Sequence, residues 1–262
     1  MKHKILIVGD SPFVNTGFSY IHRELGKYLH NNDYQIESIG LWDKRPSKQI
    51  MTYNNHYIPW NVYICRDNFQ KYANTYQKIL DIVNPTLIII ITDLWIAKFF
   101  IETTIPKIYY FHVEGGPLPF NTYGMVGEKV DWIKTLLKND LVVFAGKFGK
   151  KTTLDGFKSY NKLYKTTINI DELDKKWPII PNGVNTEIFY PLDRRSELKK
   201  ELWKINPDSF VIGFFSRMNA RKGLPYALEA FSKWPGRPQN AYFYCHCAIN
   251  DKWGWDLIKM TM

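Results

Sequence analysis

The chain has 262 residues, of which 45% are hydrophobic and 16% aromatic, so it can bury a sizeable core and is not a disordered protein. Its formal net charge of +10 favours anionic partners, such as nucleic acid, lipid headgroups or phosphorylated small molecules, without choosing among them. The sequence has three cysteines, Cys65, Cys245 and Cys247, and this small, odd number argues against a disulfide framework.

Features that would direct the chain to a membrane or out of the cell are missing from the pattern. The opening sequence MKHKILIVGD leads straight into an apolar run without the layout of a secretory signal. The longest aliphatic run, Leu87 to Ile91, is too short to span a bilayer. Together with the sparse cysteines, these observations predict a cytoplasmic protein.

Apolar patterns predict strands and helices that alternate along the first part of the chain. The predicted strands are 4–9, 34–42, 61–65, 86–93, 107–116 and 140–145. The predicted helices are 18–29, 69–83, a short helix through Trp95, 125–138 and 147–157. Such alternation is typical of an α/β layer with a parallel sheet.

The segment 177–193 interrupts this alternation with Pro178, Pro181, Gly183 and Pro191. A second strand–helix–strand pattern follows at 210–216, 224–234 and 240–247. We therefore expect an N-terminal α/β domain at 1–181, a connector at 182–195 and a partial second domain at 196–262. A single such unit is smaller than a typical independent domain and buries little surface.

Ligands of open α/β sheets bind beyond the carboxyl ends of the strands, so each strand end is a candidate site. After the first strand, Gly17 opens a helix, where a ligand could approach free backbone N–H groups. A plain turn is the alternative. The dinucleotide motif G-x-G-x-x-G is absent, which argues against a nicotinamide enzyme.

His112 and Glu114 follow the strand KIYYF and precede a Gly-Gly-Pro loop. A histidine there can share a proton with a hydroxyl or donate a hydrogen bond to a sugar oxygen, and Glu114 could orient hydroxyls. A structural role for the histidine is the alternative.

The stretch FFSRMNARKGL places Arg217 at a strand end, and Lys222 and Gly223 where the next helix begins. Two cations beside a helix N-terminus suit a phosphate or diphosphate. Arg221, between them, is expected to face solvent. The alternative is a solvated basic loop without a ligand.

Two other patterns are weaker. Gly146 and Gly149 are too close together for a phosphate-binding P-loop, so this segment is predicted to be an ordinary basic helix start. Cys245 and Cys247 share one strand face and His246 lies on the other, with no second ligand pair in range. We expect core packing for the cysteines and no metal site.

Two stretches together resemble the retaining glycosyltransferases of family 4, which have the GT-B fold. They are PNGVNTEIFYP (181–191) and IGFFSRMNARKGLPYALEAF (212–231). The loops around NTGF and FHVEGGPLP fit more weakly. The resemblance implies a Rossmann-type parallel-sheet domain on the acceptor side, followed by the first part of a second Rossmann-type domain that binds the nucleotide sugar.

The resemblance also implies roles for the candidate residues, without a metal or other cofactor. Arg217 and Lys222 would grip the donor diphosphate and, with His112, form the catalytic group. The implied donor-binding residues are Gly17, Arg217, Lys222 and Gly223. The implied acceptor or sugar contacts are Asn15, Thr16, His112 and Glu114. Asn182 and Gly183 would form the hinge.

One departure from the family pattern stands out. The family carries a Glu-x7-Glu motif that contacts donor sugar and ribose, but no glutamate follows Glu229. We expect a chain with a truncated C-terminal domain, as a fragment, a naturally short protein or half of a split enzyme with a separate C-terminal half. For such a truncated chain we expect weak binding of the donor and little or no sugar transfer. Isothermal titration with nucleotide sugars tests this expectation, and micromolar affinity of this chain would contradict it.

The expected partners are a nucleotide sugar and a glycan or lipid-linked acceptor. A second hypothesis is a non-catalytic protein that keeps the fold and binds a glycan or a partner subunit. A third, a nucleic-acid or anionic-membrane binder, has only the net charge in its favour, and no specific nucleic-acid motif is present. Peripheral contact with the inner membrane surface through basic and aromatic residues stays open.

Overall fold

The computed structural model describes residues 3–45, 52–53, 56–65, 69–113, 115–116, 121–123, 129–249 and 254–261. It divides the chain into two compact units, Met1–Gly183 and Val184–Met262. This division falls inside the predicted connector, while the predicted bounds at 181 and 195 stay predictions. Among the described residues, no helix combines the length and apolar character needed to cross a membrane.

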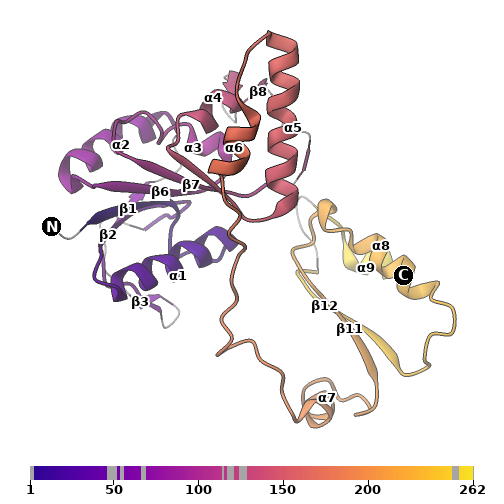
Figure 1. The fold of residues 1–262 in the computed structure, drawn as a ribbon. Coiled ribbons are helices and arrows are strands. Elements are labelled where there is room, and N and C mark those ends of the chain that lie inside the picture. Colours follow the sequence, from indigo (N-terminus) through magenta and orange to yellow (C-terminus); the bar gives the residue numbers. More distant parts are fainter. Residues whose placement is uncertain are drawn as a thin grey trace. The chain divides into compact units, whose positions relative to one another are not determined.

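Unit 1 is built on a parallel sheet of six strands in the order β10-β7-β6-β1-β2-β5 (Figure 1). The strands are β1 (Lys4–Asp10), β2 (Gln35–Leu41), β5 (Val62–Cys65), β6 (Leu87–Ile91), β7 (Lys107–Phe111) and β10 (Leu141–Phe144). Two short antiparallel pairs accompany it: β3 (Thr52–Tyr53) with β4 (His56–Tyr57), and β8 (Asn121–Tyr123) with β9 (Lys129–Asp131). The chain order reverses between β1 and β6, which is where ligands of such sheets bind.

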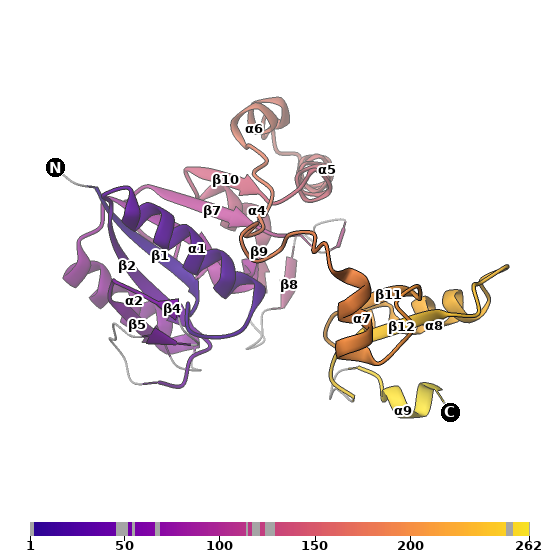
Figure 2. The ribbon, with the colours of Figure 1, turned by 90° about the horizontal axis from the view of Figure 1, so that it is seen from below.

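Helices cover both faces of this sheet. The helices of unit 1 are α1 (Gly17–Asn31), α2 (Phe69–Val83), α3 (Leu94–Ala97), α4 (Trp132–Leu137), α5 (Lys147–Tyr164) and α6 (Ile170–Lys176). Figure 1 shows α1 on one face, with α2, α3 and α4 on the other, and Figure 2 views the sheet from the side of α1. Because both faces are covered, the central strands are apolar throughout, and this explains runs such as LIIII in β6.

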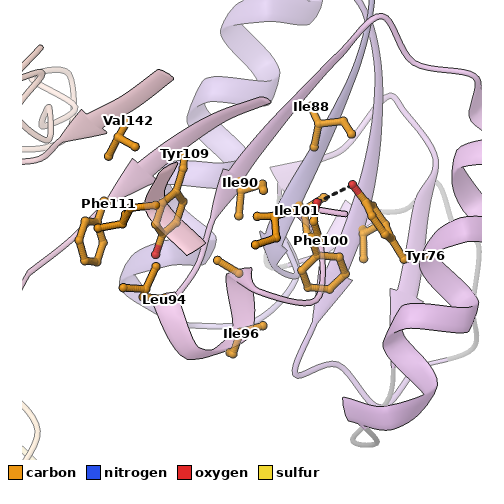
Figure 3. Packing of buried hydrophobic residues seen from close by; sticks show 14 of the residues in the cluster. Tyr76, Ile88, Ile90, Leu94, Ile96, Phe100, Ile101, Tyr109, Phe111 and Val142 are labelled. Atoms are coloured by element: carbon orange, nitrogen blue, oxygen red, sulfur yellow. Dashed lines mark hydrogen bonds between the residues drawn. The ribbon is translucent and has the colours of Figure 1, made fainter. Parts of the chain in front are cut away.

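Alternate residues of β1 separate two hydrophobic clusters. Leu6 and Val8 join the cluster under α2, α3 and α4, whereas Ile5 and Ile7 join the one under α1. Figure 3 shows the first cluster, in which the Tyr76 hydroxyl donates to the Phe100 carbonyl at 2.7 Å. The sheet is therefore fixed from both sides, and its strand ends are held in place.

Unit 2 has a parallel pair, β11 (Phe210–Phe215) and β12 (Ala241–His246), with Gly213 opposite Tyr244. Its helices are α7 (Arg195–Trp203), the 3-10 turn η1 (Ala220–Lys222), α8 (Leu224–Ser232) and α9 (Leu257–Thr261). Segment 254–257 closes onto the loop after β11, because Trp255 donates its backbone N–H to the Met218 carbonyl at 3.2 Å.

The prediction of an α/β chain with a parallel sheet is confirmed. The predicted strands match the observed parallel strands within two residues, except that the strand predicted at 107–116 ends at Phe111, and the short strands β3, β4, β8 and β9 were not predicted. Residues 125–128 of the predicted helix 125–138 lie outside the described residues, and the prediction is wrong for 129–131. The described residues form β9 up to Asp131, whose side chain accepts from the Lys134 N–H at 3.0 Å and so starts α4 at Trp132. Helices α6, α7 and α9 were not predicted.

Candidate functional site

The turn from β1 into α1 holds the first group of candidate residues. Asn15, Thr16 and Gly17 are exposed there, and Gly17 opens the helix as predicted. The Thr16 hydroxyl oxygen caps the helix by accepting from the Ser19 N–H at 3.0 Å. A Cβ added to Gly17 would meet no atom within 4 Å, so the space beside this helix start is open.

Asp10, the last residue of β1, binds this turn through a hydrogen bond from Thr16. The Thr16 hydroxyl donates to Asp10 Oδ2 at 2.5 Å, and Asp10 is buried. Burial raises the pKa of the Asp10 carboxyl, against the opposing effect of the Thr16 hydrogen bond. One threonine thus links the strand end to the helix N-terminus.

A second polar network lies at the carboxyl end of the neighbouring strand β2. Asp43, just after β2, accepts from the Ser11 hydroxyl at 2.6 Å and makes two bonds of 2.8 Å with the Arg45 guanidinium. Burial opposes ionisation of Asp43, but the bonds from Arg45 and Ser11 outweigh it and lower the pKa. The guanidinium also lies over the Phe13 ring, 4.6 Å from its centre. These contacts join the segment after β1 to the segment after β2.

His112 lies just past β7 and is brought against three partners. Its Nε2 is 3.1 Å from Asn182 Oδ1, and its ring meets the rings of Phe18 (5.0 Å) and Tyr110 (4.8 Å) edge-on. Because a carbonyl oxygen only accepts, this contact assigns a proton to Nε2. Phe18 directly follows Gly17, so the start of α1 and the end of β7 meet at this histidine.

Asn182 reaches His112 because the residues just before it run along the edge strand β10. Phe144 of β10 donates its N–H to the Pro178 carbonyl at 3.0 Å, and the Ile180 N–H donates to the Phe144 carbonyl at 2.9 Å. Beyond this pairing the Tyr110 hydroxyl lies 2.7 Å from both the Ile180 carbonyl and Asn182 Oδ1. Asn182, one of the two residues predicted to form the hinge, is therefore held against unit 1.

In unit 2, Arg217 lies at the carboxyl end of the parallel pair, as predicted. It is exposed and borders a hollow of about 610 Å³. The hollow is lined by Ser216, Arg217, Cys245, His246, Cys247 and Ala248. A guanidinium beside an open space at a strand end is suited to an anionic ligand.

Lys222 and Gly223 lie at the other end of the same loop. Lys222 is exposed and closes η1, and Gly223 precedes α8 with φ +71°. That backbone angle favours glycine, which accounts for the residue at this point. Arg221 is exposed, as predicted, and its N–H is bound by Asn219 Oδ1 at 3.2 Å.

The candidates therefore fall into two sets that belong to different units. Unit 1 brings together the start of α1, His112 and Asn182. Unit 2 holds Arg217, Lys222 and Gly223 on one loop, and the convergence of the two cations on one anion stays a prediction. Glu114 lies outside the described residues, and Gly183 is the last residue of unit 1.

Three features were missed or misjudged from the sequence. Asp10 was overlooked, although a carboxylate directly after a buried strand is a usable signal. Tyr110 was overlooked because it reads as part of an apolar strand; it lies two residues before His112 and so on the same face. Cys245 and Cys247 are half-buried at the hollow, not buried in a core.

Comparison with family models and with curated protein sequences gives no match. Solved structures with a similar fold include sucrose-phosphate synthase from Thermosynechococcus elongatus, with 12% identity over 99% of this chain and 66% of that one, at a TM-score of 0.63. The catalytic domain of starch synthase IV from Arabidopsis thaliana, bound to ADP and acarbose, has 13% identity over 94% of this chain and 68% of that one, at 0.61.

An α,α-trehalose-phosphate synthase (UDP-forming) from Burkholderia vietnamiensis has 12% identity over 94% of this chain and 64% of that one, at a TM-score of 0.60. The chain thus spans about two thirds of the length of these structures. At such identities the likeness shows the fold, which is that of the GT-B glycosyltransferases.

Proposed function

We propose that the protein is a retaining glycosyltransferase related to family 4, which moves a sugar from a nucleotide diphosphate sugar to a hydroxyl of a glycan or lipid-linked acceptor. The observation that carries this proposal is the group formed by the start of α1, His112 and Asn182 at the carboxyl edge of the sheet. It lies where ligands of such folds bind. The GT-B fold supports the same reaction class.

The donor's diphosphate is assigned to unit 2. Breaking the bond between the sugar and the diphosphate leaves negative charge on the phosphate oxygen. Arg217, and Lys222 if it converges on the same group, would stabilise that charge more in the transition state than in the ground state. Arg217 is exposed beside the hollow at the strand ends and is available for this contact.

The sugar is assigned to His112. Its protonated Nε2 can donate to a sugar oxygen once Asn182 releases it, and the flanking rings of Phe18 and Tyr110 fix the plane of the imidazole. With the charge carried by Arg217 and Lys222, attack from the face that the phosphate leaves requires no carboxylate nucleophile. The reaction would retain the configuration at the sugar carbon.

Donor binding tests this proposal. Saturation-transfer NMR with a panel of nucleotide sugars should detect weak binding by the full chain. Arg217→Ala should weaken it by about tenfold to a hundredfold, because a hydrogen bond to a charged group contributes about 1.5–3 kcal/mol. The matched control is Arg221→Ala, which removes an exposed arginine of the same loop. Equal losses in both variants, or no binding of any donor, would contradict the proposal.

A non-catalytic role in binding a glycan or a partner subunit is the second candidate. It is compatible with the same fold, because a fold by itself does not determine whether a protein catalyses a reaction. Incubation of the full chain with the donors that bind, followed by measurement of released nucleoside diphosphate, separates the two. Binding without release under all acceptor conditions favours the second candidate.

A further inference from the structure

Two cysteines border the same hollow in unit 2. Cys245 belongs to β12 and Cys247 follows two residues later, just past the end of the strand at His246. Both are free and half-buried, and both line the hollow of about 610 Å³. Neither the apolar packing of the unit nor the proposed transfer reaction uses these thiols.

Side chains two residues apart in an extended chain point to the same side, which agrees with the place of both cysteines in the lining of one hollow. In an extended chain, residues two apart have Cα atoms at most about 7 Å apart, close to the upper limit of about 6.8 Å seen in disulfides. Burial raises the pKa of the Cys245 thiol, and the adjacent charge and hydrogen bond of Cys247 raise it further.

We propose that Cys245 and Cys247 form a reversible disulfide by exchange with an anionic low-molecular-weight disulfide. The thiolate of one cysteine attacks a sulfur of the small disulfide, which forms a mixed disulfide and expels one small thiolate. The second protein thiolate then attacks the protein-bound sulfur and expels the other. The protein loses two thiol protons and two electrons, and the small disulfide is reduced to two thiols.

The surroundings of the pair suit such a reagent. Arg217 and His246 line the same hollow, and the positive charge of the guanidinium attracts a carboxylate-bearing disulfide such as oxidised glutathione. The ring closed by cysteines two residues apart is short, and the site is open to solvent. Strained or exposed disulfides are the readily reduced ones, so the bond is expected to be reversible.

The full chain should be incubated under native conditions with oxidised glutathione, quenched with an alkylating agent and analysed by mass spectrometry. We expect the loss of two hydrogens without a glutathione adduct, and a peptide linking Cys245 to Cys247. A dithiol reductant should restore both thiols. Persistent glutathione adducts, a link to Cys65, a link between chains or no reaction would each overturn the proposal.

Two variants sharpen this test. Cys247→Ser leaves a thiol without its resolving partner, so it should accumulate one glutathione, on Cys245. Cys65→Ala removes the buried third cysteine and should behave like the parent chain. Circular dichroism checks that each variant is folded, and the outcome for the unmodified chain decides the proposal by itself. Its result is independent of donor binding, so it can fail while the proposed function stands.

Discussion

His22 is a titratable residue that holds α1 on the sheet. Its Nδ1 lies 2.9 Å from the Asp10 carbonyl and its Nε2 lies 2.8 Å from the Ser38 hydroxyl. The Trp60 indole N–H donates to the same hydroxyl at 2.8 Å, so Ser38 can donate its own proton to Nε2. A neutral imidazole with its proton on Nδ1 completes this network, and burial lowers the pKa of His22 to about 4.

The lowered pKa predicts acid-sensitive stability. An unfolded histidine binds a proton below its ordinary pKa of about 6.5, whereas His22 in the folded chain does so only near 4. The contribution of neutral His22 to the free energy of unfolding is therefore complete above about pH 6.5. It is lost as the pH falls towards 4, and the total loss is about 3 kcal/mol. Urea unfolding of the parent and His22→Gln should show a stability difference that shrinks over this range.

The control for this prediction is His30→Gln, which changes an exposed histidine in the last turn of the same helix. If the parent and His22→Gln lose stability in parallel between about pH 6.5 and pH 4, the buried histidine does not carry the effect.

Among elements, α1 depends on a single hydroxyl for its start. Thr16 caps the helix and also donates to the buried Asp10 carboxyl, so one side chain serves two bonds. Thr16→Ala should lower the free energy of unfolding by about 1–3 kcal/mol, since it removes a cap and leaves a buried acceptor without its donor. Chemical denaturation measures this change, and Thr16→Ser, which keeps the hydroxyl, should lose far less. Equal losses would contradict the double role.

A glycine starts α8 in a comparable position. At φ +71°, Gly223 occupies a backbone conformation that costs other residues about 1–2 kcal/mol. Gly223→Ala should therefore destabilise the start of α8 by that amount, as measured by hydrogen exchange of the helix amides. Gly183→Ala, at a position where an added Cβ meets nothing within 4 Å, is the control and should leave exchange in α8 unchanged.

Elements with a strong local pattern were predictable, and those made by tertiary contacts were not. The apolar run of β6 predicts a buried strand, and the helical spacing of apolar residues in α2 predicts an amphipathic helix. The pairing of β9 with β8 depends on a partner strand, so the periodic pattern around it was misread as helix. Likewise, Arg217 was placed at a strand end from local order, whereas the contact of His112 with Asn182, across 70 residues, could not be.

At the scale of the whole molecule, the two units differ in how much apolar surface they bury. Both hydrophobic clusters lie in unit 1. Of the described residues in Val184–Met262, only Met218 and Leu224 are buried hydrophobic side chains, and Phe215 in β11 is 69% exposed. Since burial of apolar surface is the main stabilising term, unit 2 should be the less stable of the two.

Hydrogen exchange of the full chain tests this difference. The amides of β1 and β6 should exchange at least roughly tenfold more slowly than those of β11 and β12, because local stability follows the density of buried contacts. Equal protection in the two sheets would contradict the prediction and would mean that contacts other than those described stabilise β11 and β12.

The bond between His112 and Asn182 has a consequence for how the protein responds to its ligands. The same amide oxygen lies against the imidazole and the Tyr110 hydroxyl, and it belongs to Asn182, the residue before the last one of unit 1. A ligand that accepts a hydrogen bond from the Nε2–H of His112 must displace the Asn182 oxygen. Ligand binding at His112 and the position of the Asn182 side chain would then be thermodynamically linked, and the coupling is reciprocal: whatever holds this side chain against the imidazole lowers ligand affinity there by the same factor.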